Sequence, residues 1–125
     1  MRSVIRFVEV ESGRVVPFTI TAPYALGAPG IIYGRARWSP DSRSIYYIGQ
    51  DRAGLTGVFA QEFAPGRDTS NTRRPVAGFS DEYVTESLGL SPDGSRLTIS
   101  TGEEFATIML AEGVPGAEPP IREKP

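Results

Sequence analysis

The 125-residue chain has no cysteine, no histidine and a single lysine, Lys124. Without cysteine there is no disulfide framework and no thiol nucleophile, and without both residue types there is no zinc site of the usual kind. The missing histidine removes the most common catalytic base, and no G-x-S-x-G nucleophile elbow is present. We therefore expect a protein that is not an enzyme and that holds no cofactor.

A strong charge of one sign is also lacking. The net charge is −2, so no global basic field would recruit nucleic acid. The N-terminal apolar positions are interrupted by Arg6 and Glu9, unlike the core of a signal peptide, and proline and glycine break the other apolar stretches. We expect no nucleic-acid partner, no signal peptide and no membrane segment in this chain. These observations leave the compartment open.

Glycine and proline are abundant, with 14 and 11 residues, and no window shows a helical repeat of apolar positions. Alternation of apolar and polar residues between turn-forming residues instead predicts short antiparallel strands. The expected strands span 4–10, 15–20, 31–38, 44–48, 58–63, 74–79, 83–90, 96–100 and 105–110. The predicted fold class is all-β.

An internal repeat organises these strands. Residues 38–48 align without gaps on residues 90–100, an offset of 52, and each copy carries Ser-Pro-Asp after a large apolar residue. Proline presets the first corner of a tight turn, and Gly94 suits a left-handed position that follows. Ser42 replaces that glycine in the first copy, at a small conformational cost. Gly13 and Gly66, 53 residues apart, close a second pair of equivalent turns.

The pattern apolar-Ser-Pro-Asp-Gly-x-Arg-apolar-x-apolar resembles the WD-like repeat of TolB-type β-propellers, over roughly residues 4–111. The resemblance implies antiparallel four-stranded blades, about two and a half of them in this chain. Residues 1–20 would be the second half of a blade, 31–79 a complete blade, and 83–111 a final blade without a clear outer strand. Residues 112–125 form a proline-rich tail that we expect to be disordered.

This fold family says little about function, because propellers carry unrelated activities on one scaffold. The resemblance places the loops 21–30, 49–57, 79–86 and 101–104 on one face. They carry acidic and aromatic residues, with one arginine, that are candidates for partner contact: Tyr24, Asp51, Arg52, Asp81, Glu82, Tyr83, Glu86, Glu103 and Glu104. We predict that this face binds a protein or peptide with basic residues. The alternative is a set of solvated turns. The carboxylates lack the D-x-D-x-D-G spacing of a calcium loop, so no metal site is assigned.

Two functional hypotheses follow. In the first, the chain is a non-catalytic propeller segment that acts as a protein interaction module. In the second, it is the accessory or sensor propeller of a larger enzyme, a bacterial serine/threonine kinase or a prolyl-oligopeptidase-like peptidase. The first half-unit supplies outer-strand material that the last unit lacks. The sequence therefore predicts either a head-to-tail homo-oligomer or a piece of a longer propeller.

Overall fold

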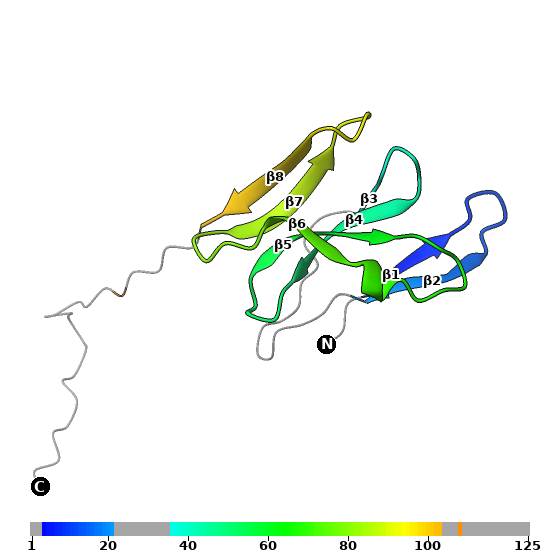
Figure 1. Ribbon diagram of the computed structural model, residues 1–125, viewed down its shortest axis with the longest axis horizontal. Coiled ribbons are helices and arrows are strands. Elements are labelled where there is room, and N and C mark those ends of the chain that lie inside the picture. The colour runs from blue at the N-terminus through cyan, green and yellow to red at the C-terminus, as the bar shows by residue number, and fades with distance from the viewer. Residues whose placement is uncertain (1–3, 22–35, 104–107, 109–125) are drawn as a thin grey trace, which may run out of the picture.

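The computed structural model describes residues 4–21, 36–103 and 108. Within these ranges the chain forms eight antiparallel strands in three separate sheets, with no α-helix and one short 3-10 turn at Ser70–Thr72 (Figure 1). The predicted all-β class is confirmed. No helix in the described part of the chain is long and apolar enough to span a membrane.

The three sheets follow one another along the chain. An N-terminal hairpin comes first, then a four-stranded sheet in which each strand pairs with the next, then a second hairpin. The strands are, in order, β1 (Val4–Val8), β2 (Val15–Thr21), β3 (Arg37–Trp38), β4 (Ser44–Gln50), β5 (Thr56–Glu62), β6 (Arg74–Gly78), β7 (Val84–Leu90) and β8 (Leu97–Gly102).

Four strand boundaries differ from the expectation by two residues, and two of them are later ends, β4 at Gln50 and β8 at Gly102. Strand β1 ends at Val8 instead of residue 10, because Glu9 donates to the Arg14 carbonyl and Gly13 donates to the Glu9 carbonyl, which closes the turn early. Strand β5 begins two residues sooner, because Thr56 pairs with Gln50. The expected strand at 105–110 and most of the one at 31–38 lie outside the described residues.

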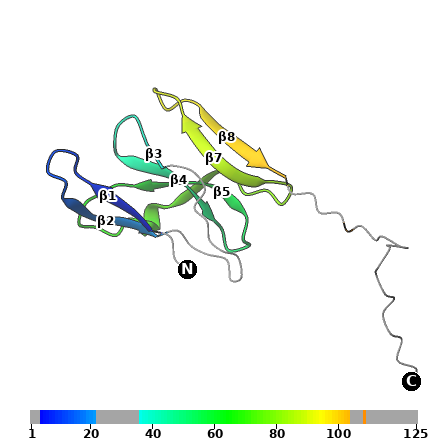
Figure 2. The same ribbon diagram turned by 180° about the vertical axis from the view of Figure 1, so that it is seen from behind.

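The four-stranded middle sheet is covered on both faces, because its side chains alternate between two neighbours (Figures 1 and 2). Ile45 and Tyr47 of β4 pack with the β1–β2 hairpin. Ile48 of β4 and Val58 of β5 pack with Leu88 of β7. The β4–β5 segment is correspondingly the most buried part of the described chain.

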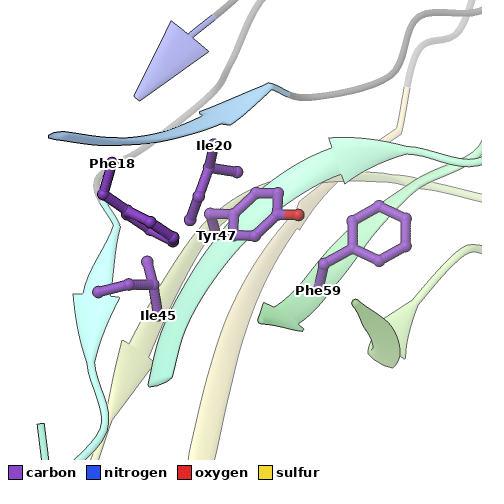
Figure 3. Packing of buried hydrophobic residues seen from close by; sticks show 5 residues of the cluster. All are labelled: Phe18, Ile20, Ile45, Tyr47 and Phe59. Carbon is purple, nitrogen blue, oxygen red and sulfur yellow. The ribbon is translucent and has the colours of Figure 1, made fainter. Parts of the chain in front are cut away.

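The interface with the β1–β2 hairpin is largely aromatic. Phe18 and Ile20 of β2 point at Ile45 and Tyr47 of β4 (Figure 3). At its rim, the ring centroids of Phe18 and Phe63 lie 4.8 Å apart in an edge-on arrangement. Complete burial of side chains this large stabilises the fold by about 1.5–3 kcal/mol each.

The interface with the β7–β8 hairpin is aliphatic and smaller, and two threonines tie it together. The Thr85 backbone N–H donates to Thr56 Oγ1 at 2.8 Å, and Thr85 Oγ1 donates to the Thr56 carbonyl at 3.3 Å. Both side chains are buried, so these bonds satisfy groups that would otherwise be costly to bury. They fix the start of β7 against the start of β5.

A buried polar network holds the long connection between β5 and β6. The Tyr47 hydroxyl donates to Gln61 Oε1 at 2.9 Å, and Gln61 Nε2 donates to Thr69 Oγ1 at 3.1 Å. Arg73 reaches across to the carbonyl of Thr21 at 3.0 Å. Burial raises the pKa of Tyr47 to about 12, so the hydroxyl keeps its proton and remains a donor.

The two Ser-Pro-Asp segments form equivalent turns, one between β3 and β4 and one between β7 and β8. In the first, Ser39 Oγ donates to Asp41 Oδ1 at 2.6 Å and accepts the Ser44 N–H at 2.9 Å. In the second, Ser91 Oγ donates to Asp93 Oδ1 at 2.7 Å and accepts the Arg96 N–H at 2.9 Å. The sequence repeat is therefore also a repeat of hydrogen bonds.

The left-handed position of each turn is also equivalent. Ser42 has φ 60° and Gly94 has φ 73°. The two turns lie against each other, because a Cβ atom at Gly94 would be 2.8 Å from Cγ of Pro40.

Candidate partner-binding surface

The direction of the strands brings several of the predicted loops to one end of the molecule. The β4–β5 loop and the β6–β7 loop both lie there, as does the end of β8, opposite the Ser-Pro-Asp turns (Figure 1). Phe79 donates its N–H to the Thr56 carbonyl at 2.8 Å, which joins the second loop to the end of the first. We call this region the loop end and define it as residues 51–55, 79–83, Glu86 and Glu103.

Close packing of Phe79 positions the β6–β7 loop. A Cβ atom at Gly57 would lie 2.5 Å from the Phe79 ring, so only glycine leaves room for it. The ring also packs edge-on against Phe59, with centroids 4.9 Å apart. Phe79 has φ 59°, a left-handed conformation that costs energy in a non-glycine residue. This packing compensates for that cost, and the exposed Asp81 and Glu82 follow Phe79 in the loop.

Asp51 differs from the other acidic residues of the loop end because its carboxylate is used within its own loop. Asp51 Oδ1 accepts the N–H groups of Ala53 and Leu55, both at 2.9 Å. Such a bond pattern fixes a turn from its first residue. Asp51 therefore shapes the β4–β5 loop, and the exposed Arg52 follows it at the tip.

The remaining carboxylates of the loop end are exposed. None of the side chains of Asp81, Glu82, Glu86 and Glu103 forms an ion pair with another residue in the described ranges. The Glu86 carboxylate lies over Gly102, where a Cβ atom would be 2.5 Å from Glu86 Oε1. Tyr83, half-buried, contributes an aromatic ring beside them.

The loop end therefore holds seven of the nine predicted contact residues. Tyr24 and Glu104 lie outside the described residues. Among the described residues, Arg52 is the single basic side chain of this region, so its charge balance is acidic. No cluster of three or more His, Cys, Asp or Glu side chains that suits a metal ion occurs in the described ranges.

Sequence reasoning missed a second feature, a surface groove of about 560 Å³ at the opposite end. Glu9, Arg14 and residues 15–17 form one wall, and Phe63 with Pro65 forms the other. The Arg14 guanidinium lies 3.6 Å from a Glu9 carboxylate oxygen, so the charges at its mouth are paired with each other. The walls are about fifty residues apart in sequence, and no local pattern joins them.

Comparisons of the chain with protein-family models, with curated proteins and with solved structures returned no match.

Proposed function

We propose that this chain is a segment of a TolB-like β-propeller whose middle sheet, β3 to β6, is one complete blade. The equivalent hydrogen bonds of the two Ser-Pro-Asp turns support this proposal. The coverage of the middle sheet by a neighbour on each face supports it too, because propeller blades pack face to face in the same way.

In this proposal the chain acts as a non-catalytic interaction module, and the loop end binds a basic protein or peptide. The observation that carries it is the set of exposed carboxylates without a charged partner in the described structure: Asp81, Glu82, Glu86 and Glu103. Lysine or arginine side chains of a partner would supply the missing positive charge. Tyr83 would add aromatic contact area, which is typical of protein interfaces.

The use of the serine side chains supports a non-catalytic role. Ser39 and Ser91 donate their hydroxyl protons to turn aspartates, and Ser87 bonds Ser100 across β7 and β8 at 2.6 Å. These hydroxyl groups stabilise turns and strands, and the lowered pKa values of Asp41 and Asp93 make both carboxylates weak bases for activating a serine.

The test is the binding of a short arginine- and lysine-rich peptide, measured by fluorescence anisotropy at about 0.05 M and about 0.3 M salt. The test variant carries Asp81→Asn, Glu82→Gln, Glu86→Gln and Glu103→Gln. The control variant carries Glu11→Gln and Glu62→Gln, two exposed carboxylates away from the loop end.

We expect the affinity to fall steeply with salt, and to fall in the test variant but not in the control. Reversing the same four charges would slow association more than it speeds dissociation, because exposed charges mainly steer the encounter. If the affinity did not change with salt, or if it fell equally in the test and control variants, the loop end would not be the binding surface.

A further inference from the structure

The outer face of the β1–β2 hairpin exposes several valines, a residue type that globular proteins usually bury. Val4 is 40% exposed, Val8 56% and Val15 67%. The inner face of the same hairpin packs in the aromatic interface through Ile5 and Phe7. The outer face therefore carries three exposed valines beside Arg6 and Thr19, and the described structure covers only the inner face.

Strands β1 and β8 each have an open edge in the described structure. Within the described residues, β1 pairs only with β2, and β8 pairs only with β7. The middle sheet has two more strands than the described part of the β7–β8 sheet, because β5 and β6 follow β4. Open edges with unpaired backbone groups are ready templates for another strand.

The middle sheet shows which strand would fit the edge of β8. Strand β8 matches β4 at an offset of 52 residues, and the turns that precede both strands have the same hydrogen bonds. Strand β1 matches β5 at an offset of 53, and the glycines that follow the two strands are both left-handed, Gly13 at φ 70° and Gly66 at φ 76°. Since β4 pairs with β5, the equivalent partner of β8 is β1.

We propose that β8 of one copy of this chain pairs antiparallel with β1 of a second copy, so that β7, β8 and the second copy's β1 and β2 form one four-stranded sheet. The register follows from that of β4 and β5, in which Gly49 lies opposite Gly57 and Tyr47 lies opposite Phe59. It places Val4 opposite Thr101, Arg6 opposite Ile99 and Val8 opposite Leu97.

This register is consistent with the way side chains alternate between the two faces of each strand. Leu97 and Ile99 point toward the middle sheet of their own copy. Val4, Arg6 and Val8 of the second copy would continue that face, toward the β5–β6 side of the middle sheet. Ile5 and Phe7 would keep their present contacts in the second copy. Val4 and Val8 would thus become buried, and no existing contact would be lost.

The contact is head-to-tail, because the N-terminal hairpin of one copy meets the C-terminal hairpin of the next. Such contacts close into a ring when the rotation per copy allows it. Each copy contributes the strands of two four-stranded sheets, so two or three copies would fall within the usual range of about four to eight blades.

Light scattering coupled to size-exclusion chromatography tests the assembly. We expect a multiple of the 13.5 kDa chain mass for the unaltered protein. Val8→Glu should reduce it to the mass of one chain, because a carboxylate would be buried in the new interface. Val10→Glu is the matched control, since Val10 lies in the turn beyond β1 and is 97% exposed. A circular dichroism spectrum checks that both variants fold.

A cysteine pair tests the register, and the absence of native cysteine makes the readout clean. In the Val4→Cys/Thr101→Cys variant, oxidation should join copies covalently, because the two side chains would be directly opposite. Val4→Cys/Ser100→Cys should not cross-link, because Ser100 points to the other face of the sheet.

A monomeric unaltered chain would overturn the proposal. An oligomer whose mass is unchanged by Val8→Glu would also overturn it. So would equal cross-linking in the two cysteine variants. None of these results depends on whether the loop end binds a basic peptide.

Discussion

The two ends of the molecule differ in what most of their carboxylates contact. At one end, which we call the turn end (residues 9–14, 39–43 and 91–96), Asp41 and Asp93 accept hydrogen bonds from serines and backbone groups of their own turns. At the loop end, Asp81 and Glu82 are exposed and have no charged partner within the described ranges.

The difference separates carboxylates that stabilise the fold from those that are available to a partner. The hydrogen bond from Ser91 lowers the pKa of Asp93 to about 2, and the bond from Ser39 lowers the pKa of Asp41. A lowered pKa means that the folded state favours the charged form of the side chain. Removal of an engaged carboxylate should therefore affect folding, whereas removal of an unengaged one should affect only binding.

The largest expected effect is at the contact between the two Ser-Pro-Asp turns. Gly94→Ala places a Cβ atom 2.8 Å from Pro40 at a residue with φ 73°. Left-handed backbone and overpacking together should lower the free energy of unfolding by about 1–3 kcal/mol. Urea denaturation measures this loss.

The control for that substitution is Gly13→Ala, also at the turn end. Gly13 has φ 70°, but no atom lies within 4 Å of the position that an alanine methyl group would take, so this variant isolates the backbone cost. Equal losses at the two positions would show that the contact with Pro40 is unimportant and that the turns do not support each other.

The next effect is a loss of stability in acid that comes from the turn end. The folded-state pKa of Asp93 is about 2, below the ordinary 3.8, so its stabilisation is complete above about pH 4 and is lost as the pH falls through about 2. The melting temperature should fall over this window, and Asp93→Ala should make it less dependent on pH there. A variant with an unchanged acid profile would show that these hydrogen bonds do not stabilise the fold.

The turn end was also the part of the fold that the sequence predicted best. Ser-Pro-Asp followed by a left-handed residue is a local pattern, and its bonds join residues at most five positions apart. The strand alternation likewise needs only neighbouring residues. Long-range features were missed, such as the Thr56–Thr85 bonds and the bond from Arg73 to the Thr21 carbonyl, because no local pattern specifies them.

For the candidate site, the sequence groups residues by their loops but does not distinguish the roles of the individual side chains. Loop spacing alone grouped Asp51 with Asp81, since both are acidic residues in adjacent loops. Only the backbone geometry shows that Asp51 accepts two N–H groups of its own loop, whereas Asp81 projects into solvent. The role of a carboxylate depends on which donors the fold brings within about 3 Å, and the sequence does not specify that distance.

A smaller effect is expected where the first turn departs from the repeat. Ser42 has φ 60° at the position that glycine occupies in the second turn. Ser42→Gly relieves the left-handed cost but adds chain entropy to the unfolded state, for a net gain of about 0.5–1 kcal/mol. Chemical denaturation detects this gain, and a loss of stability would show that the Ser42 side chain stabilises the turn.

The smallest effect on folding is expected at the loop end. Asp81→Ala and Glu82→Ala remove exposed side chains that have no charged partner in the described structure, so the free energy of unfolding should stay within about 0.5 kcal/mol of its original value. Asp51→Ala, in the adjacent loop, is the matched contrast, because it deprives the Ala53 and Leu55 N–H groups of their acceptor and should destabilise the protein. If Asp81→Ala were as destabilising as Asp51→Ala, its carboxylate would be part of the fold, and the distinction between the two ends would fail. If it is neutral for folding and weakens peptide binding, the same substitution identifies a residue kept for contact with a partner.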